Sequence, residues 1–121
     1  VQTCALPIWG LQEIVSLVNV TKAVGQRVLL GAVNMRLFEG AKIGVLGANG
    51  AGKSTTMSIL TGVLPATSGS CTVYGRDVGT QTDLVHKLIG YCPQHDVLFN
   101  ELSLIEHLEL FCALSPLARI L

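Results

Sequence analysis

The residues with the clearest chemistry form one short glycine-rich segment. In order they are Gly47, Ala48, Asn49, Gly50, Ala51, Gly52, Lys53, Ser54 and Thr55. This order satisfies the phosphate-binding pattern G-x-x-x-x-G-K-[ST]. Consecutive backbone N–H groups in a tight loop can meet the charge of phosphate groups, and glycines keep side chains from obstructing that approach. The segment therefore predicts a nucleotide-binding loop.

Three polar side chains at the end of this segment have separate predicted roles. The Lys53 ammonium group is expected to reach the β- and γ-phosphates of a nucleotide. The Ser54 hydroxyl offers an oxygen ligand to Mg²⁺, a hard cation, and Thr55 is expected to donate on the α-phosphate side. A helix that begins near Lys53 adds its free N-terminal N–H groups and the positive end of its dipole. The alternative interpretation is a glycine-rich turn with an incidental lysine.

The flanking residues supply the elements that such a loop requires. Ile43–Leu46 is a short apolar run bounded by glycines, which predicts a strand buried on both faces. Ser54–Leu60 is expected to continue as a helix. The order strand, loop, helix favours the nucleotide site over the incidental turn.

Strands and helices alternate along the rest of the chain. The residue patterns predict further strands over Leu11–Val20, Val28–Phe38, Cys71–Tyr74 and Ile89–Cys92, and helices over Asp83–Leu88 and Leu102–Leu114. Ser103 is the expected N-cap of the last helix, and Glu106 completes a capping box three residues later. This alternation favours an α/β fold.

The charge balance limits the classes of partner. The 121 residues include 8 Lys and Arg and 8 Asp and Glu, so the formal net charge is zero, which argues against a nucleic-acid partner. Charged residues make up 13% of the chain and apolar residues 50%. A surface this poor in charge predicts that the chain is a piece of a larger assembly. The longest uncharged run, residues 54–75, is broken by Pro65 and Gly69, so no membrane-spanning helix is expected.

The cysteines and histidines lack the spacing of a metal site or of a disulfide framework. They are Cys4, Cys71, Cys92, Cys112, His86, His95 and His107. We expect buried or half-buried free thiols in a reducing compartment.

Residues 1–8, VQTCALPI, differ from the rest of the chain. They have neither the basic start nor the long apolar run of a signal peptide. The codons GTT-CAG-ACG-TGT-GCT-CTT-CCG-ATC encode this octapeptide and resemble a common sequencing adapter read in frame. We therefore expect residues 1–8 to be a library artefact and residues 9–121 to be one truncated domain. An ordinary disordered N-terminus is the alternative.

Several segments together resemble the ATP-binding domain of ABC transporters. They are residues 49–56, Leu60-Thr61-Gly62, Thr67-Ser68-Gly69-Ser70 and residues 90–99, the last being similar to the Q-loop of that family. Tyr91-Cys92-Pro93-Gln94-His95 and Glu106-His107-Leu108 resemble the A subfamily, the large lipid-handling exporters, and in particular the first of their two ATP-binding domains. The resemblance covers Leu11–Leu114.

The resemblance implies an α/β P-loop NTPase core of the ABC type, with the start of its helical subdomain. It implies ATP and Mg²⁺ as cofactors, Lys53 and Gln94 in catalysis, and Ser54 and Gln94 as Mg²⁺ ligands. Gln94 would also position the attacking water and report the γ-phosphate to the membrane half of the transporter. From the residues alone, Gln94 could equally be a polar turn residue after Pro93.

The partners implied by the resemblance are the transmembrane domains of the same transporter and a second ATP-binding domain, at the cytoplasmic face of a membrane. Residues 96–114 would form part of the surface that meets a transmembrane coupling helix. Phe99, Leu102 and Leu104 would lie in that interface, although core packing explains them equally well.

The sequence departs from the family pattern in two respects. No aromatic residue follows Thr21-Lys22 to stack on adenine, and Val24 offers only apolar contact. No Leu-Ser-Gly-Gly-Gln signature, Asp-Glu strand or switch histidine is found, so the transition state would lack essential partners. We expect the parent protein to hydrolyse ATP to drive transport, and we expect this chain alone to hydrolyse ATP negligibly. Two alternatives stay open: an ABC ATPase without a membrane partner, and a truncated product that is not stably folded.

Overall fold

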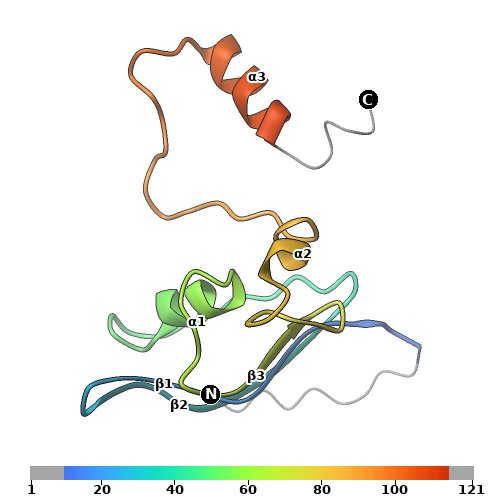
Figure 1. Ribbon diagram of the computed structural model, residues 1–121, viewed down its shortest axis with the longest axis vertical. Helices are drawn as coiled ribbons and strands as arrows, with labels where there is room; N and C mark the ends of the chain where they lie inside the picture. Colours follow the sequence, from blue (N-terminus) through green and yellow to red (C-terminus); the bar gives the residue numbers. More distant parts are fainter. Residues whose placement is uncertain (1–9, 115–121) are drawn as a thin grey trace. The chain divides into compact units, whose positions relative to one another are not determined.

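The structure, a computed structural model, describes residues 10–114, and the chain divides after Ile89 into two compact units. The first unit holds β1 (Glu13–Val24), β2 (Arg27–Phe38), α1 (Lys53–Leu60), β3 (Ser68–Val73), β4 (Arg76–Asp77) and α2 (Thr82–His86), and the second holds α3 (Leu104–Leu114) (Figure 1). The predicted artefact, residues 1–8, lies outside the described residues. No helix within residues 10–114 has the length and apolarity to cross a membrane.

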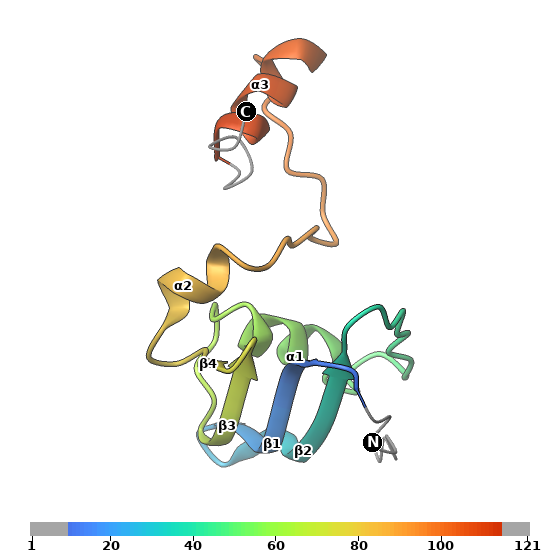
Figure 2. The ribbon, with the colours of Figure 1, turned by 90° about the vertical axis from the view of Figure 1, so that its right-hand side faces the viewer.

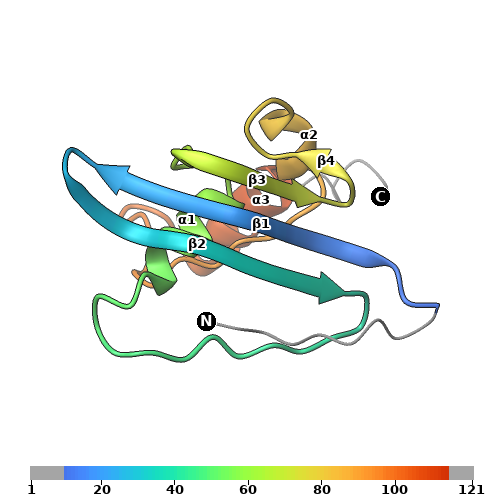
Figure 3. The same cartoon turned by 90° about the horizontal axis from the view of Figure 1, so that it is seen from below.

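The four strands of the first unit form one antiparallel sheet in the order β2-β1-β3-β4. Figure 2 shows β3, β1 and β2 side by side, and Figure 3 shows the opposite face of the sheet from the one that α1 covers. The strands predicted over residues 11–20, 28–38 and 71–74 are confirmed with shifted bounds. The helices predicted over residues 54–60, 83–88 and 102–114 are confirmed in the same way.

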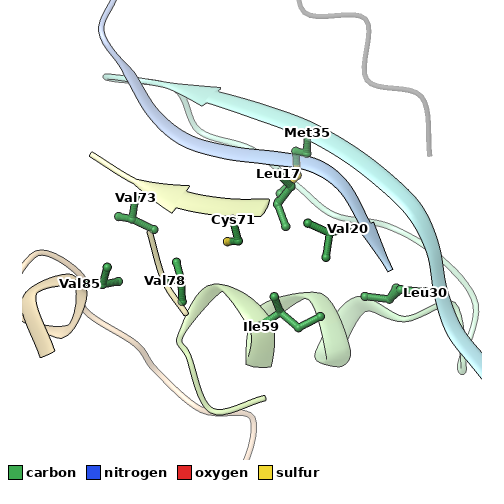
Figure 4. Close-up of a cluster of buried hydrophobic side chains, with 9 residues drawn as sticks. All are labelled: Leu17, Val20, Leu30, Met35, Ile59, Cys71, Val73, Val78 and Val85. Carbon is green, nitrogen blue, oxygen red and sulfur yellow. The ribbon is translucent and has the colours of Figure 1, made fainter. Parts of the chain in front are cut away.

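Nine apolar side chains form the core of the first unit, and they come from the sheet, from α1 and from the segment that includes α2. They are Leu17, Val20, Leu30, Met35, Ile59, Cys71, Val73, Val78 and Val85 (Figure 4). Ile59 is the apolar side chain through which α1 enters this core. Burial, with a smaller effect of the Asp77 charge, raises the pKa of the Cys71 thiol to about 11. Cys71 is therefore uncharged at neutral pH and packs as an apolar side chain.

Two irregularities in the pairing of β1 with β2 compensate each other. Residues 17–20 of β1 span one position more than their partners, and residues 30–33 of β2 then span one position more than theirs. Positive φ angles at Asn19 (50°) and Ala32 (46°) accompany these bulges. The Asn34 side chain joins the two: it accepts from the Asn19 N–H (2.9 Å) and donates to the Ala32 carbonyl (3.1 Å). The two strands thus regain a common register.

Gly69 lies where β3 passes the bulge of β1. Its φ angle is +85°, and a Cβ atom there would lie 2.6 Å from the Val18 carbonyl oxygen and closer still to that of Asn19. Both the backbone conformation and the space exclude a side chain at this position.

Two of the predicted strands are wrong. Residues 41–48 and residues 89–99 have no helix or strand, although strands were predicted at Ile43–Leu46 and Ile89–Cys92. Leu46 is 91% exposed, the opposite of the burial expected from its apolar setting. A central strand forms only where neighbouring strands pair with both of its edges. The outer strands of the described sheet are β2 and β4, and neither pairs with these segments.

The second unit is built on α3, and its predicted capping box is confirmed. The Glu106 carboxylate accepts from the N–H and from the hydroxyl of Ser103, both at 2.7 Å, and the Glu106 N–H donates to the Ser103 hydroxyl oxygen at 3.4 Å. The bonds from Ser103 hold the pKa of Glu106 below its usual value. The helix start is therefore fixed by side chains of its own first turn.

We predict that Gly69→Ala lowers the free energy of unfolding by at least about 2 kcal/mol more than Gly25→Ala does. Gly25 also has a positive φ angle, +59°, but a Cβ atom there meets nothing within 4 Å. The pair therefore separates the steric clash with β1 from the backbone strain that both variants share. Urea denaturation of the two variants measures the difference, and equal losses would contradict the close approach of β3 to the bulge.

Candidate nucleotide-binding site

The predicted phosphate loop lies between β2 and α1 in the first unit. α1 begins at Lys53, and Gly52 precedes it as the N-cap in the left-handed conformation (φ 88°, ψ 10°). Gly50 also has a positive φ angle, +86°. Glycine adopts these angles without the steric cost that other residues meet. The loop geometry thus requires glycine at two of the three positions where the sequence has it.

The Lys53 side chain binds two backbone carbonyl groups of the loop. Its Nζ atom donates to the Gly47 carbonyl at 2.5 Å and to the Ala48 carbonyl at 3.0 Å. The Ala51 N–H donates to the same Ala48 carbonyl at 3.1 Å, which forms the turn of the loop. The ammonium charge is therefore held within the turn of the loop, next to the N-terminus of α1.

The N-terminus of α1 has no side-chain cap and no acidic residue in its first turn. The first N–H groups of the helix consequently keep their capacity to donate, and the positive end of the helix dipole is not neutralised locally. Together with the Lys53 charge, this arrangement suits a polyanion such as a nucleotide phosphate chain.

Thr56 is a residue whose role sequence reasoning missed. Its N–H and its hydroxyl both donate to the Gly52 carbonyl at 2.9 Å, and the residue is buried. These two hydrogen bonds fix the first turn of α1 against the loop. The available signal was a threonine four residues after the last loop glycine, because threonine in a helix can bond to the carbonyl four residues back.

The neighbouring hydroxyl side chains differ in exposure. Ser54 is exposed and Thr55 is half-buried. An exposed hydroxyl oxygen beside the loop fits one position in the oxygen shell that Mg²⁺ requires, with nucleotide phosphates and water as the usual further ligands. Within residues 10–114, no group of three or more His, Cys, Asp or Glu side chains could hold a metal ion by itself.

Gln94 belongs to the second unit. It is exposed and lies in the segment between α2 and α3 that has no helix or strand. Its predicted roles in binding Mg²⁺ and positioning water stay predictions.

A cavity of about 230 Å³ lies elsewhere in the first unit, between the C-terminal end of α1 and the β3–β4 region. Two of its polar side chains, Asp77 and Thr82, already have partners. The Asp77 carboxylate accepts from the Thr80 N–H (2.9 Å) and hydroxyl (3.0 Å), and the Thr82 hydroxyl donates to the Val78 carbonyl (2.7 Å).

Comparison with known proteins specifies the family of this fold. The family model described as ABC transporter matches residues 30–119. The chain belongs to this family, and the matched region is its ATP-binding domain.

Three curated relatives from the A subfamily illustrate the similarity. The chain is 47% identical over 94 residues to the rat protein "ATP-binding cassette sub-family A member 2", covering 78% of this chain and 4% of the relative. It is 46% identical over 101 residues to the mouse "Glucosylceramide transporter ABCA12", covering 84% and 4%. It is 43% identical over 99 residues to the human "Retinal-specific phospholipid-transporting ATPase ABCA4", covering 82% and 4%. The chain thus spans a small part of the length of each relative.

Solved structures show the same fold. One is the ATP-binding subunit of an ABC transporter, with a TM-score of 0.75 and 26% identity over 83% of this chain and 42% of that chain. Another is a bacterial Atm1-family ABC exporter with ATP bound, with a TM-score of 0.66 and 27% identity over 73% of this chain and 16% of that chain. The predicted α/β P-loop NTPase fold of the ABC type is confirmed.

We predict that Lys53→Met loosens the loop even without nucleotide. The variant keeps a long side chain but removes the donor that binds the Gly47 and Ala48 carbonyls, so amide exchange at Ala51 should accelerate about three- to tenfold. Hydrogen exchange followed by NMR measures this rate. Lys42→Met, outside the loop, is the control and should leave the Ala51 rate unchanged. An unchanged rate in Lys53→Met would show that the lysine does not organise the loop.

Proposed function

We propose that this chain is the Mg-ATP-binding portion of a lipid-exporting ABC transporter of the A subfamily. The observation that carries the proposal is the glycine-built loop that holds the Lys53 ammonium group beside the uncapped N-terminus of α1. Residues 47–55 would bind the phosphates through backbone N–H groups. Lys53 would reach the β- and γ-phosphates, and Thr55 would donate on the α-phosphate side.

Ser54 and Gln94 would hold Mg²⁺, which when bound would neutralise charge on the β- and γ-phosphates. Gln94 would also orient the attacking water. The parent protein would hydrolyse ATP, whereas this chain alone would hydrolyse it negligibly, because binding phosphates does not by itself stabilise the transition state.

The transported substrate is inferred from the relatives. Two of them carry names that specify glucosylceramide and phospholipid, so we infer a lipid for the parent of this chain. Its partners would be the transmembrane domains of the same transporter and a second ATP-binding domain, at the cytoplasmic face of a membrane. Exposed apolar side chains on α3, among them Leu104 (76%) and Ile105 (68%), support a covering partner for this helix.

Residues 1–8 would be adapter-derived, with the domain beginning at Trp9. The alternative functions are an ABC ATPase that is not linked to transport and a truncated product without function. The low share of charged residues, 13%, argues mildly against the first alternative.

We predict that the chain binds a fluorescent ATP analogue in the presence of Mg²⁺ and that Lys53→Ala weakens this binding at least about tenfold, because a charge-assisted contact to phosphate is lost. Ser54→Ala should remove most of the difference between Mg²⁺ and EDTA while leaving metal-free binding intact. Lys42→Ala is the matched control for net charge. Equal affinity in the wild type and in Lys53→Ala would exclude the loop as the nucleotide site and favour the functionless product.

We further expect a long-read transcript of the parent gene to encode membrane-spanning segments, a signature motif and an Asp-Glu strand, and to lack the adapter-like octapeptide. Reading through both ends of the coding region for this chain checks all four features. A complete parent without membrane-spanning segments would contradict the transporter and leave the ABC ATPase without a membrane partner.

A further inference from the structure

His107 is a buried polar side chain of the second unit, and both of its ring nitrogens are engaged. It is 9% exposed on α3. The Phe99 N–H points at Nε2 at 2.9 Å, and Nδ1 lies 2.9 Å from the Ser103 carbonyl oxygen. An N–H can only donate and a carbonyl oxygen can only accept. The ring must therefore be neutral, with its proton on Nδ1 and its lone pair on Nε2.

Two aromatic rings flank the imidazole. The ring centroids of Phe99 and Phe111 lie 6.2 and 6.4 Å from that of His107, with interplanar angles of 28° and 25°. His107 thus holds Phe99 twice, by its backbone N–H and by its ring. The residue next to Phe99, Leu98, is 67% exposed, and Val97 is 52% exposed. We name residues 97–99 the apolar tip of this unit.

We propose that neutral His107 is a positioning residue that fastens the apolar tip to α3, and that protonation of its Nε2 atom releases the tip. A proton from solvent on Nε2 would occupy the lone pair that accepts from Phe99. Two N–H groups would then face each other, and the Phe99 N–H would lose its acceptor. Among these contacts the imidazole is the group that can gain a proton, so a fall in pH is the change that would cause the release.

The charged and titratable groups around His107 lie on α3 and on the loop packed against the ring. Glu106 precedes it on α3, and the bonds from Ser103 keep the pKa of that carboxylate below its usual value, so it stays ionised between pH 5 and 8. The loop packed against the ring carries the exposed groups His95, Asp96 and Glu101, and α3 carries the exposed Glu109. Of these, His95 is a second imidazole and therefore needs a control variant of its own.

The consequence is a pH-dependent attachment of the apolar tip to α3. The device needs no nucleotide, because every contact that defines it lies within residues 97–111. It therefore goes beyond the proposed function and stands or fails separately from ATP binding.

The test is NMR of the ¹⁵N-labelled 121-residue chain between pH 8 and pH 5. At pH 8 the His107 ring should show the Nδ1–H tautomer. The Phe99 amide should then exchange up to about tenfold more slowly than its intrinsic rate. On acidification that protection should disappear, while amides in the middle of α3 stay protected. A ring with the proton on Nε2 at pH 8, or a Phe99 amide that is unprotected there, would overturn the proposal.

Variants assign the effect to His107. His107→Gln keeps an acceptor oxygen that does not titrate, so Phe99 protection should persist down to pH 5. His107→Phe keeps the aromatic stack and removes the acceptor, so Phe99 should be unprotected at every pH. In the matched control, His95→Gln, the Phe99 amide should lose its protection on acidification as it does in the wild type. The proposal would be contradicted if Phe99 lost its protection with falling pH in His107→Gln. It would also be contradicted if Phe99 kept its protection at pH 5 in His95→Gln. If His107→Phe unfolds α3, His107→Gln alone provides the test.

Discussion

The attachment of α1 to the sheet through Ile59 is the interaction on which the candidate site depends. A helix of eight residues has little stability of its own, so tertiary packing must hold it. Ile59 is 2% exposed among core side chains from β1, β2 and β3. One turn earlier on the same helix, Thr56 binds the Gly52 carbonyl through both its N–H and its hydroxyl. The apolar contact and the two hydrogen bonds together direct the N-terminus of α1 into the loop.

The loop needs this support because its own composition works against order. Glycine loses more conformational freedom on folding than any other residue, and unsatisfied N–H groups gain nothing until an anion arrives. Lys53 offsets part of this cost by binding two loop carbonyls. The glycines and the unpaired N–H groups thus make the loop dependent on the packing of α1 against the sheet.

Ser103 organises the second unit through its backbone and its hydroxyl group. Its N–H and hydroxyl bind Glu106, and its carbonyl binds His107, so one residue fixes both the start of α3 and the imidazole that holds Phe99. Other apolar side chains of α3, among them Leu104 and Ile105, are largely exposed. The chain belongs to the ABC transporter family and spans 4% of the length of the rat relative described above.

Local patterns determined much of this protein. The spacing of Gly47, Gly52 and Lys53 predicted the loop, and the Ser103–Glu106 pair predicted the start of α3, because both depend on backbone geometry within a few residues. The period-two alternation near residues 28–38 predicted β2 for the same reason. The matches to the ABC transporter family confirmed the fold that these motifs indicated.

Tertiary structure decided what depends on distant partners. Ile43–Leu46 has the composition of a buried strand, yet it stays irregular because no described strand pairs with it. The compensating bulges at Asn19 and Ala32 are recognisable only once β1 and β2 are paired. The neutral state of His107 likewise follows from the Phe99 N–H and the Ser103 carbonyl that surround it, since the sequence supplies the imidazole but only the fold brings a donor to one nitrogen and an acceptor to the other.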